Sequence, residues 1–136
     1  MKKFSLAVLT AFVLFGCGDS KQQEKLLLDS VIAVHDKVMA SDEQLMKNKM
    51  ILDSLIKNAG TAVSQDSAKV YLKIVDDADN AMSDWMHKFD AENKGKSHQE
   101  IIDYLTDQKK KIAVIDSQIN NAVTISNKYL NTTSKK

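Results

Sequence analysis

Apolar residues recur at alternating steps of three and four from Leu27 to Ala59, which is the repeat of a coiled-coil seam. The pattern predicts a long amphipathic helix from about residue 23 to residue 58. A second apolar stripe runs beside the first and consists of Leu28, Ile32, Met39, Met46 and Ile56. A face with two adjacent stripes can contact two neighbouring helices, so the pattern favours a three-helix bundle over a two-stranded coiled coil.

The same repeat predicts two further helices, at about residues 64–90 and 98–129. The polar connections between the three helices are short, so neighbouring helices are expected to run antiparallel. We therefore predict an all-α fold, an antiparallel up-down-up three-helix bundle with coiled-coil-like packing over residues 24–130. Residues 131–136 are polar and are expected to form a disordered tail.

Residues with known preferences for helix ends lie at the predicted boundaries. Gly60 suits the left-handed position that follows a helix C-terminus. Ser64 or Asp66 can cap the second predicted helix through a side-chain oxygen. Ser97 with Glu100 three residues later matches a capping box, which predicts the start of the third helix.

The segment Ala81–Phe89 holds the only tryptophan of the chain. Its large apolar residues recur at helical spacing and are expected to form a core wedge or interaction surface between the other two helices: Met82, Trp85 and Phe89. Folding the chain about its two connections places Trp85 near Val38 of the first helix. The same folding places Trp85 near Ile102 of the third helix.

Three polar residues interrupt the apolar seams. Ser41 and Asn48 lie in the seam of the first predicted helix, and Gln108 lies in the seam of the third. Polar residues at such positions fix the register of packed helices at some cost in stability. These three residues are therefore expected either to set the register of the bundle or to admit another helix.

The first segment of the chain has the features of a bacterial export signal. Lys2 and Lys3 precede an apolar run, Phe4–Phe15, that is shorter than the roughly 20 residues that a membrane-spanning helix needs. Leu14-Phe15-Gly16-Cys17 follows and resembles the lipobox of bacterial lipoproteins. The resemblance implies a lipoprotein signal peptide over residues 1–16, cleaved before Cys17. It also implies a diacylglycerol thioether on Cys17 and a polar tether over residues 17–23.

Composition narrows the classes of function. The 19 basic residues are all Lys and are balanced by 18 acidic residues, so no nucleic-acid partner is expected. Cys17 is the only cysteine, which leaves no disulfide and, once acylated, no thiol nucleophile. The sequence contains no Gly-rich phosphate loop, no nucleophile-elbow motif and no zinc-protease motif, so we do not expect an enzyme.

Three histidines fall at one end of the predicted bundle: His35, His87 and His98. With nearby methionines they raise the alternative of a metal- or haem-binding periplasmic module. Seam positions direct His35 to the flank of the core and His87 to solvent, whereas metal ligands must converge on one ion. Surface histidines around an apolar core are therefore the preferred interpretation, with no metal and no cofactor beyond the lipid on Cys17.

Two further polar patterns were considered as sites. Asp76, Asp77 and Asp79 fall on a regular helix without the turn glycine of a calcium loop, so they are expected to form a solvated face paired with Lys. Asp66-Ser67-Ala68 resembles an O-glycosylation motif of periplasmic proteins, which makes Ser67 a candidate for modification. Similar triplets at Ser30 and Ser54 lie inside the first predicted helix.

Three segments together resemble a family of small lipoproteins of the Bacteroidota: His35–Met39, Asp77–Asp79 and Ala81–Phe89. Some members carry the label "viral A-type inclusion protein", which reflects coiled-coil similarity. The resemblance is clearest over the first two predicted helices. It implies no established activity.

The sequence therefore predicts a membrane-anchored lipoprotein of the bacterial cell envelope that acts as a non-enzymatic helical scaffold or interaction module. Its expected partners are the membrane, through the lipid on Cys17, and another envelope protein. The expected location is the outer membrane, facing the periplasm. The sequence does not define an oligomeric state.

Overall fold

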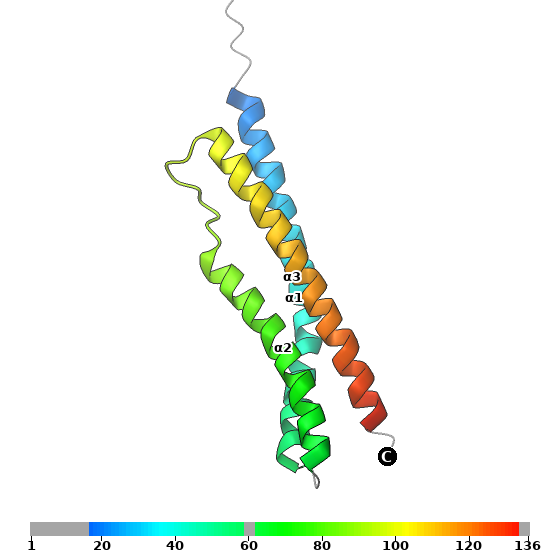
Figure 1. The fold of residues 1–136 in the computed structure, drawn as a ribbon. Helices are drawn as coiled ribbons and strands as arrows, with labels where there is room; N and C mark the ends of the chain where they lie inside the picture. Colours follow the sequence, from blue (N-terminus) through cyan, green and yellow to red (C-terminus); the bar gives the residue numbers. More distant parts are fainter. Residues whose placement is uncertain (1–16, 59–61, 134–136) are drawn as a thin grey trace, which may run out of the picture.

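The computed structural model describes residues 17–58 and 62–133, and these residues form three α-helices and no strand. The helices are α1 (Cys17–Asn58), α2 (Ala62–Lys88) and α3 (His98–Thr133). Figure 1 shows α2 running antiparallel to α1 and α3, which are parallel to each other. All three pairs of helices are in contact. The predicted all-α, up-down-up three-helix bundle is therefore confirmed.

The core follows the predicted seam. On α1, every seventh residue is fully buried, at Val31, Val38, Leu45 and Leu52. The remaining buried apolar residues come from α2 and α3: Ala68, Val75, Ala78, Met82, Trp85, Leu105, Ile112, Ile115, Ile119 and Ala122. A heptad repeat keeps one stripe facing the partner helices along the whole bundle, and each fully buried aliphatic side chain contributes about 1.5–3 kcal/mol.

The second apolar stripe of α1 is only partly covered. Leu28 and Ile56 are half-buried, and Ile56 packs against the core. Ile32, Met39 and Met46 remain 36–38% exposed. The prediction that α1 contacts two neighbouring helices is confirmed. These three residues lie about 100° around α1 from the adjacent fully buried positions, so they lie at the edge of the buried face.

Both outer helices extend beyond their predicted bounds. Residues 18–23, predicted as a tether, form the first turns of α1, where Asp19 lies favourably near the positive end of the helix dipole. Residues 131–133, predicted as tail, continue α3. The hydroxyl of Thr132 donates to the carbonyl of Tyr129 at 2.7 Å, and that of Thr133 donates to the carbonyl of Leu130 at 2.9 Å. Residues 134–136 lie outside the described residues.

The N-terminus of α2 also differs from the prediction. The helix begins at Ala62, so Ser64 and Asp66 lie inside its first turns and are not its caps. Asp66 instead pairs with Lys69 at 3.0 Å, one turn further along α2. Gly60, which was expected to follow the end of the first helix, lies outside the described residues.

Residues 89–97 connect α2 to α3 through a hydrogen-bonded loop. The carboxylate of Asp90 accepts the backbone N–H groups of Glu92 and Asn93, both at 3.1 Å, and lies 2.8 Å from the ammonium of Lys96. Lys96 and these backbone N–H groups hold the pKa of Asp90 below its usual value. Asn93 is buried with φ at +50°, a conformation that asparagine tolerates better than most residues.

The capping box predicted for α3 is confirmed. The carboxylate of Glu100 accepts the backbone N–H and the hydroxyl of Ser97, both at 2.7 Å. The hydroxyl oxygen of Ser97 in turn accepts the N–H of Glu100 at 3.4 Å. These bonds satisfy donors that the first turn of a helix leaves without a partner, so they fix where α3 begins.

The register between α2 and α3 differs from the prediction. Trp85 is hydrogen-bonded to Gln108, well past Ile102, the position expected from a tight turn. Figure 1 shows the first turns of α3 lying beyond the end of α2 and alongside the first turns of α1. The side chain of His98 lies 2.8 Å from that of Glu24 on α1, in agreement with this arrangement. The loop at residues 89–97 carries the chain past the end of α2, so α3 is displaced along the bundle from the expected position.

Candidate functional site

Trp85 lies in the core near the C-terminal end of α2 and is 7% exposed. Its indole N–H donates to the side-chain oxygen of Gln108 on α3 at 2.9 Å. Phe89 stacks on the indole with ring centroids 4.7 Å apart, and the ring of His35 on α1 lies 6.0 Å away at a tilt of 33°. Met82 is buried one turn earlier, whereas Phe89 is half-buried. The expected wedge therefore contacts both neighbouring helices.

The three histidines have separate partners. Nδ1 of His35 lies 3.0 Å from the carboxylate of Asp36, and Nδ1 of His98 lies 2.8 Å from the carboxylate of Glu24. Nδ1 of His87 lies 2.7 Å from the backbone carbonyl of Ser83, on the exposed side of α2. Across residues 17–58 and 62–133, no group of three or more His, Cys, Asp or Glu side chains could hold a metal ion. The three histidines therefore do not form one cluster.

A buried polar network joins α1 to α3. Asn48 is 1% exposed, and its amide donates to the hydroxyl of Ser126 at 2.7 Å and to the side-chain oxygen of Asn127 at 2.9 Å. Its own oxygen accepts the amide of Gln44 at 2.9 Å. The hydroxyl of Ser126, which is fully buried, donates to the carbonyl of Ala122 one turn earlier. Each polar side-chain atom of Asn48 and Ser126 therefore has a partner inside the bundle.

All three predicted polar seam residues bond to a side chain on another helix. Ser41 donates to the side-chain oxygen of Asn120 at 3.3 Å, while Asn48 and Gln108 make the bonds described above. Their partners were not identified from the sequence. Ser126 lies at a buried seam position of α3, and Asn127 lies beside it. A hydrogen bond between side chains on two helices forms at only one axial offset of those helices. The bonds therefore support a role for these residues in setting the register of the bundle.

A cluster of charged side chains joins α1 to α2. The ammonium of Lys49 lies 2.8 Å from the carboxylate of Asp76 and 3.2 Å from that of Asp79. The close contact with the Asp76 carboxylate is the main cause of a raised pKa of Lys49. Burial, and then the charge of Asp79, raise the pKa of Asp42 on the same side of α1. Two of the three predicted solvent-facing acids thus bridge helices, while Asp77 pairs with Lys73 along α2.

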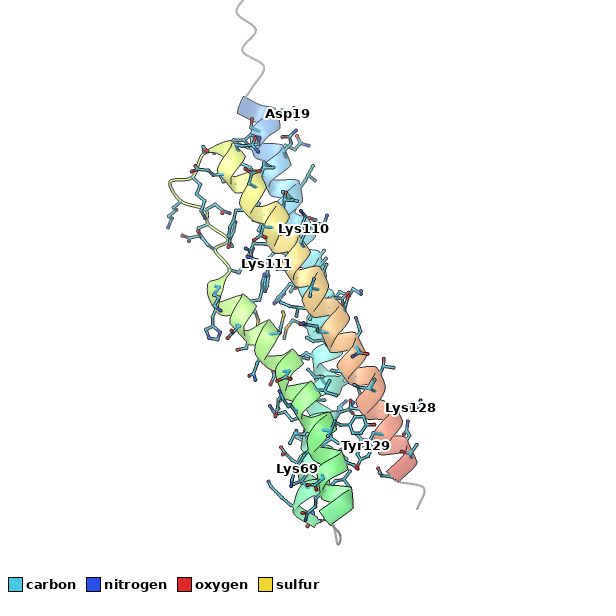
Figure 2. The ribbon with its side chains drawn as sticks, viewed as in Figure 1. Asp19, Lys69, Lys110, Lys111, Lys128 and Tyr129 are labelled. Atoms are coloured by element: carbon cyan, nitrogen blue, oxygen red, sulfur yellow. The ribbon has the colours of Figure 1, made fainter. Side chains whose placement is uncertain are left out.

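Three hollows follow the groove between α2 and α3. The first, which we call the Trp85 cleft, has a volume of about 430 Å³ and is lined by Asp84, Trp85, Lys88, Gln108, Lys111 and Ile115. A smaller hollow of about 170 Å³ lies beside Ala78 and Gln118. The third, of about 420 Å³, lies beside Tyr71 and Tyr129, whose rings stack at 4.3 Å. Figure 2 shows Tyr129 and Lys111 at different heights along α3.

The predicted lipidation site, Cys17, is the first residue of α1. The predicted signal peptide, residues 1–16, lies outside the described residues, so cleavage and acylation stay predictions. Within the described part of the chain, no helix is both long enough and apolar enough to cross a bilayer.

Ser67, the candidate for O-glycosylation, is exposed in the first turns of α2, and the neighbouring Ala68 is fully buried. At the two other triplets, the hydroxyl of Ser30 donates to the carbonyl of Leu27, and that of Ser54 accepts the amide of Asn58. Modification at Ser67 therefore stays a prediction.

No family model matches the chain, and no curated protein or solved structure is found to be similar to it.

Proposed function

We propose that the protein is a lipoprotein of the bacterial cell envelope, held to the outer membrane on its periplasmic side by acyl chains on Cys17. The observation that carries the proposal is Leu14-Phe15-Gly16-Cys17, directly after a short apolar run and directly before a helical bundle. Two or more acyl chains hold a protein stably at a bilayer because each buried methylene contributes about 0.8 kcal/mol.

In this proposal the bundle acts as a non-enzymatic scaffold or interaction module. This part of the proposal is supported by the contacts that the buried residues make. The polar side chains buried inside the bundle are hydrogen-bonded to one another, and the aromatic residues near Trp85 pack against one another. These contacts stabilise the bundle, which has the shape of a rod. At about 1.5 Å per residue, the 42 residues of α1 make this rod about 63 Å long.

The membrane anchor is tested by metabolic labelling with an alkyne analogue of palmitate. The wild-type chain is expected to take up the label and to sediment with membranes. Cys17→Ser is expected to lose the label and to be released into the soluble fraction, because Cys17 is the only cysteine that could be acylated. An equally labelled Cys17→Ser variant, or an unlabelled wild-type chain, would refute the anchor.

The scaffold role is tested by photocrosslinking in cells, with a photoreactive amino acid at one exposed position on each helix. Suitable positions are Met39 on α1, Val70 on α2 and Val114 on α3, all of which are exposed. A scaffold is expected to give a discrete crosslinked product from one face and none from the others. Absence of a crosslinked product at all three positions, in chains that are correctly localised, contradicts the role.

A further inference from the structure

The Trp85 cleft differs from the other two hollows between α2 and α3 in the chemistry of its walls. Trp85 and Ile115 supply an aromatic and an aliphatic surface, and Gln108 supplies a carboxamide. Two ammonium groups, from Lys88 and Lys111, face one carboxylate, from Asp84. The lining therefore combines an apolar base with two exposed ammonium groups, whose charges are balanced by Asp84 and by Asp107 beside the cleft. Its volume of about 430 Å³ lies within the range of small-molecule sites.

The base of the cleft is held in place from several directions. The indole of Trp85 is fixed by its hydrogen bond to Gln108 and by the stacked ring of Phe89. His35 lies 6.0 Å from the indole on the α1 side. Gln108 uses its oxygen for Trp85, and its amide nitrogen lies 3.3 Å from the carboxylate of Asp107. A binding surface that is fixed before the ligand arrives loses little entropy on binding.

The two lysines of the cleft are available to an anion. Lys88 pairs with Asp84 at 3.2 Å and Lys111 pairs with Asp107 at 2.6 Å, each one turn earlier on its own helix. All four side chains are more than half exposed to solvent. Exposed ion pairs of this kind contribute little to stability, so a ligand can replace them at small cost. Figure 2 shows Lys111 on α3 at the height where α2 ends.

We propose that the Trp85 cleft binds a small anion carried on a flat apolar body, such as an aryl carboxylate or an aryl sulfonate. The apolar body packs on Trp85 and Ile115, and the anionic group lies between the ammonium groups of Lys88 and Lys111. The carboxamide of Gln108 supplies a further hydrogen-bond donor. This binding activity goes beyond a scaffold role and does not depend on the lipid anchor.

The proposal is tested with 8-anilinonaphthalene-1-sulfonate on the chain of residues 17–136 carrying Cys17→Ser. This chain contains all three helices and the whole described core. The emission of the probe gives its affinity. The site of binding is reported by the indole N–H resonance, which is a single NMR peak because Trp85 is the only tryptophan. We expect saturable binding that shifts this peak in proportion to occupancy.

The double variant Lys88→Gln/Lys111→Gln is expected to weaken binding at least tenfold, because both positive charges of the cleft are lost. Lys73→Gln is the matched control, since Lys73 also forms an exposed pair one turn along α2, with Asp77, but does not line the cleft. It is expected to bind with unchanged affinity. Both lysines of the double variant are exposed, so an unchanged thermal midpoint and near-UV circular dichroism spectrum are expected to show that it folds.

Four results would each overturn the proposal. The first is equal affinity of the probe for the wild-type chain and the double variant, and the second is an indole peak that does not move. The third is a loss of binding in Ile51→Ser, because Ile51 lines an apolar hollow on α1 that could take up the same probe. The fourth is a probe that does not bind at all to the folded chain.

Discussion

The interface between α1 and α3 and the interface between α2 and α3 share one helix but are held in different ways. Between α1 and α3, directional bonds recur along the bundle, from His98 with Glu24 to Asn48 with Ser126. Between α2 and α3, aromatic residues lie at both ends, with Trp85, which is hydrogen-bonded to Gln108, at one end and the stacked Tyr71 and Tyr129 at the other. Hollows lie between these contacts.

This difference separates two tasks that a helical bundle must perform. A buried hydrogen bond contributes only about 0.5–1.5 kcal/mol net, but it is lost if the helices shift by one position. Apolar packing contributes more free energy but tolerates several arrangements. The α1–α3 pair therefore carries most of the bonds that specify alignment, while the packing of α2, with its one bond from Trp85 to Gln108, mainly supplies stability and leaves hollows beside α3. Each substitution below tests one part of this comparison.

The largest effect is expected for Trp85→Ala, which removes the main apolar contact of α2. It should lower the free energy of unfolding by about 3–5 kcal/mol, measured by urea denaturation. Met86→Ala is the matched control, because Met86 is adjacent but 42% exposed, and should change stability by less than about 0.5 kcal/mol. If both variants unfold at the wild-type urea concentration, packing at Trp85 does not stabilise α2.

Asn48 tests the alignment of α1 with α3. Asn48→Ala should cost about 1–3 kcal/mol, since Gln44 and Asn127 lose a buried partner. Asn48→Leu/Ser126→Ala removes the bond between the two helices and should recover much of this loss. It should also broaden or double the amide peaks of α1 and α3 in NMR spectra, because the register is relaxed. One sharp set of peaks in the double variant would show that packing alone sets the register.

A smaller effect is expected at the connection that offsets α2 from α3. Ser97→Ala removes the capping oxygen of α3 and should lower stability by about 1 kcal/mol, measured as the urea midpoint. The bonds from Ser97 hold the pKa of Glu100 below its usual value. Their contribution is therefore present at neutral pH and is lost as the pH falls through the pKa of Glu100 in the folded state. Identical pH dependence in Ser97→Ala and the wild type would contradict this assignment.

The smallest effect is expected at Asp42, beside the α1–α2 charge cluster. Its pKa is raised in the folded protein by burial and by Asp79, so its ionised form opposes folding. Asp42→Asn should therefore stabilise the protein at pH 7 by less than about 1 kcal/mol, after allowance for partial exposure to solvent. The gain should shrink as the pH falls through the folded-state pKa of Asp42. Thermal midpoints between pH 7 and pH 4 measure it; a gain that grows on acidification excludes this cause.

Much of the fold could be predicted because a heptad repeat indicates which residues of a helix face the core. Val31, Val38, Leu45 and Leu52 were recognisable from spacing alone, and the Ser97–Glu100 cap from local chemistry. Spacing along one helix does not report the axial offset between two helices. That offset depends on the path of residues 89–97, and this path follows from the bonds that Asp90 accepts from backbone groups. Gln108 could therefore be predicted as a seam residue, but its bond to Trp85 could not.

The candidate sites were less predictable, because they depend on pairs of distant residues. Lys49 joins Asp76 and Asp79 only when α1 and α2 are packed together, and Lys88 and Lys111 line one cleft only when α2 and α3 are packed together. Composition and local motifs carry no signal for such pairs. The histidines show the converse case, in which residues predicted at one end of the bundle have separate partners.

The start of α1 at Cys17 has a mechanical consequence for an anchored protein. A lipid on the first residue of a helix that runs through the whole bundle leaves no slack between the bilayer and the rod. In the proposed anchored protein, tilt at the membrane is transmitted along the bundle, and the C-terminal end of α1 sweeps an arc whose radius is about 63 Å for 42 residues. With the proposed lipid on Cys17, such a rod would act as a spacer that presents its far end at a defined height above the membrane.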